Sequence, residues 1–168
     1  MGYQTTVFEA QPVAGGMLGI AVPEFRLPRQ VIEEEIQYIE NCGVDIRYNS
    51  PIDAKHTFND LISEGYSAVF IAAGALASKH IGIPGEDENL EGIYYGLDFL
   101  SKVRMGQDVP LSGKTVVIGG GNVAVDVART ALRSGAHDVQ IFCLEPRDEM
   151  PAWEKDVEEA NDEGIIIN

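Results

Sequence analysis

The residues whose types and spacing could do chemistry are concentrated in one stretch, KTVVIGGGNVAVDVAR at positions 114–129. Gly119, Gly121 and Ala124 have the spacing G-x-G-x-x-A, after an apolar run and before a helix-like pattern. In a dinucleotide-binding loop the first glycine permits a tight turn, the second lets the backbone approach a pyrophosphate, and the small third residue keeps the helix close to its strand. Unpaired N–H groups at the helix N-terminus favour the phosphates. This context favours dinucleotide binding over a glycine-rich turn that binds nothing.

An acid follows the next strand-like run. Glu145 comes directly after VQIFCL at 139–144, where such a fold places a carboxylate on the adenosine ribose hydroxyls. A carboxylate there accepts hydrogen bonds from the diol and disfavours an added 2'-phosphate. Arg147, two positions on, supplies the opposite preference. The alternative for both residues is a solvated, charged loop.

Composition narrows the class of protein. The chain has 168 residues, 45% of them hydrophobic, and a net charge of -15. Such a chain can build a core, and its charge argues against nucleic-acid or anionic-membrane partners. No apolar run reaches the ~18 residues of a membrane span, and the N-terminus lacks a signal-peptide pattern, so we expect a cytoplasmic protein. Cys42 and Cys143 lack disulfide or metal spacing and are expected to be reduced, mostly buried thiols.

Short runs rich in β-branched residues alternate with segments of helical periodicity, which is typical of an α/β fold with parallel strands. We predict strands at 5–9, 44–47, 68–73, 114–118, 139–143 and 165–167. We predict helices at 29–42, 59–64, 96–105, 122–134 and from Pro151 onward. Pro28 and Gly43 are suitable start and stop residues for the helix between them.

Turn residues indicate the domain organisation. Gly82, Pro84, Gly85 and the acidic run 86–88 mark a boundary between two units. We expect a first domain at 1–82, a linker and crossover helix at 83–113, and a Rossmann-like unit at 114–168.

The start of the chain looks like part of a second dinucleotide fold. The strand at 5–9 ends in an acid, Glu9, and Gly15 and Gly16 follow closely. Taken alone, Glu9 is more often an ordinary carboxylate at a strand end. The first strand and the glycine loop of such a fold would have to precede Met1.

Five successive segments carry a family resemblance, and they are VFEAQPVAGGMLGIAVPEFRLP, AVFIAAGALASKHIGIPGED, GIYYGLDFL, VVIGGGNVAVDVARTALRSGA and RDEMPAWEKDVEEA. In this order they resemble the small subunit of glutamate synthase. They equally resemble the flavin-binding region of dihydropyrimidine dehydrogenase and related iron-sulfur oxidoreductases. The resemblance covers essentially the whole chain. It implies a flavin domain interrupted by an NAD(P)H domain, with hydride passing from nicotinamide to FAD and electrons passing on to iron-sulfur clusters.

The resemblance also implies the residues of an FAD site. Glu9 and Ala10 would meet the adenosine ribose, the loop Gly15, Gly16 and Met17 would line the flavin, and Arg26 would contact the cofactor. Ile52 would lie near the adenine. Ala73 and Gly74 match the turn at which the chain passes close to FAD, although the family has a threonine where this chain has Ala73.

On the nicotinamide side, the resemblance implies that the pyrophosphate is held by Gly119, Gly120, Gly121, Asn122 and Val123. Members that use NADPH tend to carry paired arginines where this chain has Leu144 and Glu145. With Arg147 nearby, we predict a modest preference for NADH over NADPH.

The same resemblance implies an incomplete segment of an FAD-dependent NAD(P)H oxidoreductase, inactive by itself, with its iron-sulfur clusters in other regions or in partner subunits. We expect a partner oxidoreductase subunit or iron-sulfur protein, and self-association through an open sheet edge. The alternatives are a free-standing NAD-dependent dehydrogenase and a nucleotide-binding module without turnover. His56, His80 and His137 are expected at the surface, Trp153 is expected to pack near a helix start, and Val157 and Ala160 are expected to face inward.

Overall fold

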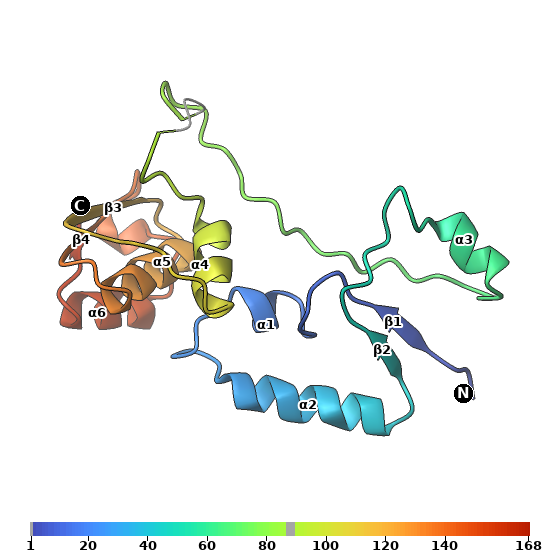
Figure 1. Cartoon of the computed structure of the whole chain (residues 1–168). Helices are drawn as coiled ribbons and strands as arrows, with labels where there is room; N and C mark the ends of the chain where they lie inside the picture. Colours follow the sequence, from blue (N-terminus) through green and yellow to red (C-terminus); the bar gives the residue numbers. More distant parts are fainter. Residues whose placement is uncertain (1, 87–89) are drawn as a thin grey trace. The chain divides into compact units, whose positions relative to one another are not determined.

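The computed structural model describes residues 2–86 and 90–168, which form two compact units (Figure 1). Unit 1 comprises Met1–Ile20 and Leu27–Ala75, and unit 2 comprises Ala21–Arg26 and Leu76–Asn168. Asp87 and Glu88, which belong to the predicted acidic turn, lie outside the described residues. The chain therefore enters unit 2 twice, first as a short segment and then as a continuous domain.

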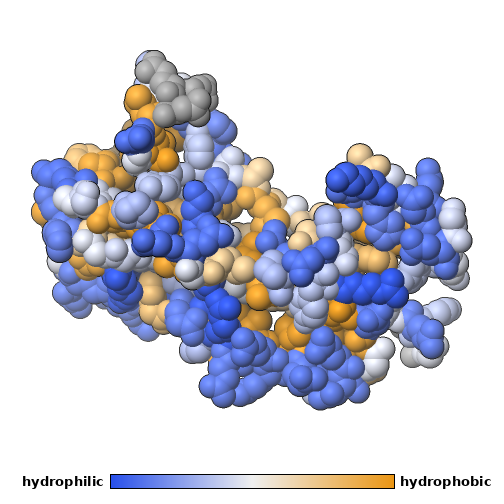
Figure 2. All heavy atoms as spheres, viewed as in Figure 1, coloured by the Kyte–Doolittle hydropathy of each residue, from blue (hydrophilic) through white to orange (hydrophobic). Residues whose placement is uncertain are grey.

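Unit 1 is built on one parallel pair of strands. Strand β1 (Thr6–Phe8) pairs with β2 (Asp45–Arg47), with Val7 opposite Ile46. Helix α2 (Arg29–Asn41) connects them, starting after Pro28 and ending before Gly43, whose φ of +91° favours glycine. These elements confirm the predictions. The outward face of α2 is hydrophilic, and its exposed residues include Glu33, Glu34 and Glu35 (Figure 2).

Two short helices complete unit 1. Helix α1 (Met17–Ile20) was not predicted, because four residues give no measurable periodicity. Helix α3 (Phe58–Ser63) confirms the helix predicted at 59–64. It begins with a capping box, in which the Thr57 side chain accepts from the Asp60 backbone N–H and Asp60 accepts from the Thr57 backbone N–H.

The strand predicted at 68–73 is wrong. These residues are extended but outside any sheet, and Phe70 is 91% exposed. A strand needs hydrogen-bonded neighbours, and within the described ranges the strands of unit 1 pair only with each other. The apolar composition of the segment reports a preference for burial that no neighbouring strand satisfies here.

Unit 2 contains a parallel sheet of order β3-β4-β5. Its strands are β3 (Lys114–Ile118), β4 (Asp138–Phe142) and β5 (Ile166–Ile167), close to the predicted ranges. Its helices are α4 (Gly96–Arg104), α5 (Asn122–Arg133) and α6 (Glu154–Asp162), with a 3-10 turn at Arg147–Glu149. The core lies between the sheet and helices α5 and α6, where the most deeply buried side chains are Val125, Ala128, Ile141 and Ala160.

The start of α6 corrects the prediction of a helix from Pro151. The helix begins at Glu154, three residues later. The residues before it form hydrogen bonds with the glycine loop and the start of α5 instead. The Ala152 N–H donates to Gly120 O at 3.0 Å, and the Trp153 N–H donates to Asn122 Oδ1 at 2.8 Å. The segment before α6 is therefore shaped by the glycine loop rather than by helical periodicity.

Several single-residue predictions have clear outcomes. Val157 and Ala160 face inward as predicted, His137 and His80 are exposed, and His56 is half-buried in a loop. The Trp153 side chain is 72% exposed, so the prediction that it packs is wrong, because only its backbone is held. Both cysteines are free, but Cys42 is exposed and Cys143 half-buried, so the prediction of mostly buried thiols is also wrong. None of the helices that the structure describes is long and apolar enough to cross a membrane.

Candidate functional site

The glycine loop joins β3 to α5 at the edge of the sheet in unit 2. Gly119 has a φ of +133°, in the left-handed region that favours glycine, and its N–H donates to Phe142 O at 2.8 Å. The loop thus turns sharply while it remains attached to the end of β4. Gly121 follows as the N-cap of α5.

Gly120 and Gly121 differ in what surrounds them. A Cβ on Gly120 would lie 2.9 Å from Glu145 Oε2 and 3.0 Å from Cys143 Cβ, so a side chain there would force the neighbours to move. A Cβ on Gly121 would meet nothing within 4 Å. Gly120 is therefore needed for packing inside unit 2, whereas Gly121 leaves open space above the start of α5.

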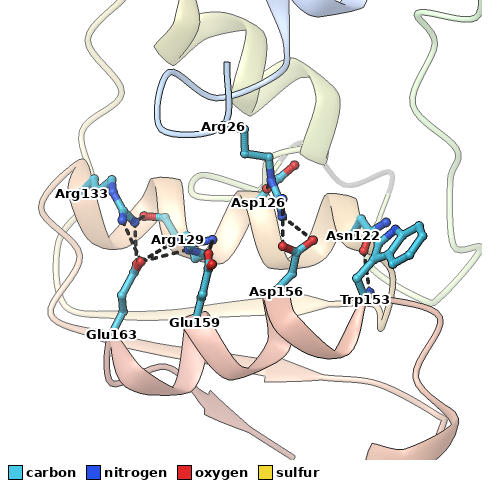
Figure 3. Close-up of polar contacts among 9 residues, drawn as sticks. All are labelled: Arg26, Asn122, Asp126, Arg129, Arg133, Trp153, Asp156, Glu159 and Glu163. Carbon is cyan, nitrogen blue, oxygen red and sulfur yellow. Dashed lines mark hydrogen bonds and ion pairs between the residues drawn. The ribbon is translucent and has the colours of Figure 1, made fainter. Parts of the chain in front are cut away.

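The N-terminus of α5 has donors available for an anion. Gly121 O accepts from the N–H groups of Ala124 and Val125, and the N-cap supplies no side-chain hydrogen bond to the first turn. The side chain of Asn122 turns instead toward the start of α6, where its Oδ1 accepts the Trp153 N–H (Figure 3). An N-terminus of a 12-residue helix without a side-chain cap favours a negative group.

Glu145 and its neighbours differ in how far they are exposed. The half-buried Glu145 carboxylate lies beside Gly120. Leu144 is 100% exposed, and Arg147 is exposed at the start of the 3-10 turn. Val123, on the first turn of α5, is also exposed. The structure therefore brings Glu145 to the glycine loop and leaves Leu144 and Arg147 toward solvent.

In unit 1 the residues implied for a flavin lie around the end of β1. Glu9 is half-buried and accepts the Gln11 N–H at 2.8 Å. Ala10 follows it at the surface. Gly15 and Gly16 both have positive φ, +101° and +54°, immediately before Met17 starts α1. An acid near a strand end and a glycine turn are thus present in both units, although in unit 2 the glycine turn comes first along the chain.

Gly19 is a glycine that the sequence reasoning missed. A Cβ there would lie 2.5 Å from the Ala14 carbonyl oxygen, which is a backbone atom and cannot rotate away. Its signal in the sequence was the short spacing Gly15, Gly16, Gly19. The other implied flavin residues of unit 1 are Ile52, which is half-buried, and Ala73 and Gly74, which are exposed, the latter with a φ of +71°.

Arg26 lies in unit 2, where three nitrogens of its guanidinium face two carboxylates (Figure 3). Nη1 and Nη2 contact the two oxygens of Asp156 at 3.0 and 2.9 Å, and Nε donates to Asp126. Burial lowers the pKa of Arg26, but the hydrogen bonds to Asp156 and Asp126 outweigh it, so the pKa is raised. A direct contact of Arg26 with a cofactor stays a prediction.

A second charged cluster joins the far ends of α5 and α6. Arg129 contacts Glu159 and Glu163, each at 2.7 Å, and Arg133 reaches Glu163 at 2.5 Å (Figure 3). The hydrogen bond from Arg133, opposed by burial and assisted by Arg129, lowers the pKa of Glu163 from 4.5 to about 2. This cluster was not predicted, although acidic residues at helical spacing on one segment and basic residues at helical spacing on another were a usable signal.

Comparison with known proteins relates almost the whole chain to pyridine nucleotide-dependent oxidoreductases. The family described as pyridine nucleotide-disulphide oxidoreductase matches residues 4–164. The chain is 45% identical to the NADP(+)-dependent formate dehydrogenase subunit beta of Moorella thermoacetica, over 99% of this chain and 24% of that protein. The chain is 35% identical to the NAD-dependent dihydropyrimidine dehydrogenase subunit PreT of Escherichia coli, and it covers 39% of that protein. It is 34% identical to the glutamate synthase [NADPH] small chain of the same organism, and it covers 36% of that protein. The chain thus spans between a quarter and two fifths of the length of these relatives.

A solved structure shows the same fold. FprA, a Mycobacterium tuberculosis oxidoreductase, matches with a TM-score of 0.74 and 24% identity, over 95% of this chain and 40% of FprA. Together with the parallel sheets of both units, this match confirms the predicted Rossmann-like α/β fold.

Proposed function

Because the chain belongs to the pyridine nucleotide-disulphide oxidoreductase family, we propose that it is a segment of a flavin-dependent NAD(P)H oxidoreductase subunit. In the whole protein, hydride passes from nicotinamide to FAD and electrons pass on to iron-sulfur clusters. Supporting this role, the relatives are named as subunits of formate dehydrogenase, dihydropyrimidine dehydrogenase and glutamate synthase. A partner oxidoreductase subunit follows from the same comparison. Self-association and a cytoplasmic location remain predictions.

The observation that carries this proposal is the open space above Gly121 at the start of α5. The backbone can approach a pyrophosphate there, and the N–H groups of Asn122 and Val123, which precede those that donate to Gly121 O, would donate to it. We assign the nicotinamide dinucleotide to Gly119, Gly120, Gly121, Asn122 and Val123. Gly120 keeps the loop against β4, and Asn122 holds the start of α6, so the chain presents a preformed cradle.

The flavin is assigned to the 1–82 domain, with the linker and crossover helix at 83–113 leading to the nicotinamide unit. The positive φ values of Gly15 and Gly16, and the close approach of Gly19 to Ala14, fit a loop whose backbone lies against a cofactor. Glu9 would accept hydrogen bonds from the ribose, Ala10, Met17 and Ile52 would line the site, and Ala73 and Gly74 would complete it. When bound, the flavin would supply the hydride acceptor, and the residues of this chain would bind and orient it.

For the nucleotide we propose a modest preference for NADH. Glu145 lies beside the glycine loop, and its charge disfavours a 2'-phosphate, while the exposed Leu144 offers no charge. The names of the relatives include both NADP(+) or NADPH and NAD, so this preference rests on Glu145 alone. Arg147 is close enough in sequence to moderate it.

Replacing Gly121→Val tests the nicotinamide site. A Cβ at Gly121 meets no protein atom within 4 Å, so the fold should be retained, but the valine occupies the space through which the pyrophosphate approaches. We expect calorimetry to show at least a tenfold loss of NADH affinity with an unchanged circular dichroism spectrum. Ser134→Val, at the other end of α5 where φ is −88°, is the control for a valine added to the same helix away from the loop. Equal NADH affinity in the parent and Gly121→Val would refute the assignment of the loop.

Replacing Glu145→Arg tests the preference between nucleotides. The arginine pairs with a 2'-phosphate and no longer accepts from the ribose diol, so the ratio of NADH to NADPH affinity should fall about tenfold or more. Titration of both nucleotides against each variant measures it, with Glu158→Arg on the exposed face of α6 as the control for net charge. A ratio that is the same before and after the change would remove Glu145 from the site.

A further inference from the structure

Three consecutive residues join the 21–26 segment to the rest of unit 2. Glu24 forms an ion pair with Arg104 on α4. The Phe25 ring lies under the guanidinium groups of Arg129 and Arg133, at 4.6 and 4.3 Å from its centroid. Arg26 then reaches between α5 and α6. The segment therefore contacts all three long helices of unit 2, although it is far from them in the sequence.

Arg26 differs from Glu24 and Phe25 because it contacts α5 and α6 near their N-terminal ends, beside the glycine loop. Asp126 lies one turn after the glycine loop on α5, and Asp156 lies in the first turn of α6. Arg26 Nη1 donates to Asp156 Oδ1 at 3.0 Å, Nη2 lies in ion-pair contact with Asp156 Oδ2 at 2.9 Å, and Nε donates to Asp126. A lysine has no such planar set of donors and cannot reproduce this bridge.

The bridged helices hold the glycine loop from both sides. Next to the Arg26 bridge, Asn122 Oδ1 accepts the Trp153 N–H at 2.8 Å (Figure 3). Gly120 O accepts the Ala152 N–H at 3.0 Å. These two contacts join the loop and α5 to the segment that starts α6. A change in the distance between the helix starts would therefore displace the loop backbone.

Without Arg26, two carboxylates would face each other across the helices. The side chains of Asp126 and Asp156 are only 14% and 13% exposed, so water screens them weakly. Burial raises the pKa of Asp126 although Arg26 acts to lower it, which indicates that this carboxylate is poorly solvated. Two such like charges repel each other, and both repel a phosphate at the nearby helix N-terminus.

We propose that Arg26 is a positioning residue for the nicotinamide nucleotide: by bridging Asp126 and Asp156 it fixes the starts of α5 and α6, and it neutralises carboxylates that oppose the pyrophosphate. This inference rests on the proposed function. It extends that function to a residue of the 21–26 segment, whose side chain contacts Asp126 and Asp156 rather than the glycine loop.

The test compares four versions of the 168-residue chain by calorimetric titration with NADH. Arg26→Gln leaves both carboxylates without their bridge, and we expect about tenfold weaker binding. The triple variant Arg26→Gln, Asp126→Asn, Asp156→Asn removes the repulsion along with the bridge, and we expect affinity within about threefold of the parent. Arg133→Gln is the matched control, because it removes an arginine that joins the same two helices at their far ends, and its affinity should stay within about twofold.

Thermal unfolding of each version separates positioning from general stability. Arg26→Gln and Arg133→Gln should lower the Tm similarly, while only Arg26→Gln should lower the affinity for NADH. The proposal is overturned if Arg26→Gln binds as the parent does, if Arg133→Gln weakens binding equally, or if the neutral triple variant is not rescued. A parent chain that binds neither NADH nor NADPH would overturn the proposed function and this inference together.

Discussion

Unit 1 and unit 2 each contain parallel strands, an acid at a strand end and a glycine-rich turn, yet they bury these features very differently. In unit 2, β4 lies between β3 and β5, and its Ile141 is fully buried. In unit 1, β1 pairs only with β2 among the described strands, and Val7 at its centre is 41% exposed. A local motif therefore does not fix its own burial, because the strands and helices around it supply the cover.

The charges of the two units show the same contrast. In unit 1, Arg47 and Asp45 form a pair whose side chains are each about half exposed. In unit 2, the Arg129 side chain is only 8% exposed and is held between two glutamates. Exposed pairs contribute little to stability because water competes for both charges, whereas partly buried networks depend on every partner. We expect charge changes to affect unit 2 far more than unit 1.

The largest difference should come from Ile141→Ala. It removes a fully buried side chain from the central strand of unit 2, and we expect a loss of about 3–4 kcal/mol in the free energy of unfolding. The matched change Val7→Ala in unit 1 should cost less than about 1 kcal/mol, because that side chain is already partly in water. Urea unfolding followed by circular dichroism measures both.

Equal losses at these two positions would contradict the comparison, since they would mean that β1 is as well covered as β4. Hydrogen exchange at the β1 and β4 amides provides the independent check. We expect protection in β4 to exceed protection in β1 in the parent chain.

A smaller effect, visible mainly in its pH dependence, is expected for Glu163→Gln. The pKa of Glu163 is lowered from 4.5 to about 2. The stabilisation that its charge contributes to the folded state is therefore fully present above pH 4.5 and is lost as the pH falls toward 2. At neutral pH the variant should be less stable by about 2 kcal/mol. The difference between parent and variant should shrink as urea unfolding is repeated at decreasing pH below 4.5.

The unit 1 counterpart, Asp45→Asn, breaks the exposed pair with Arg47 and should leave stability unchanged at every pH tested. A constant difference between parent and Glu163→Gln across the acid range would show that Glu163 acts by packing rather than by charge. It would also remove the electrostatic contrast between the two units.

Much of the fold followed from the sequence because the signals were local. Pro28 and Gly43 bounded α2 correctly, and the apolar run at 114–118 coincides with β3. The glycine loop was recognised because its geometry depends on residues that are adjacent in the chain. The segment 68–73 was misassigned because its composition reports a preference for burial, while a strand also requires a partner.

The sequence by itself determined the family, the alternation of strands and helices, the turn at Gly119 and Gly121, and the position of Glu145 after the next strand, because each depends on neighbours within a few residues or on an ordered series of motifs. Only the tertiary structure decided that Arg26 bridges Asp126 and Asp156, which are 100 and 130 positions away. It also decided that Gly120 packs against Glu145 while Gly121 faces open space. The physical reason is that side-chain bridges and close backbone approaches are set by how separate elements pack, and no local propensity encodes that distance.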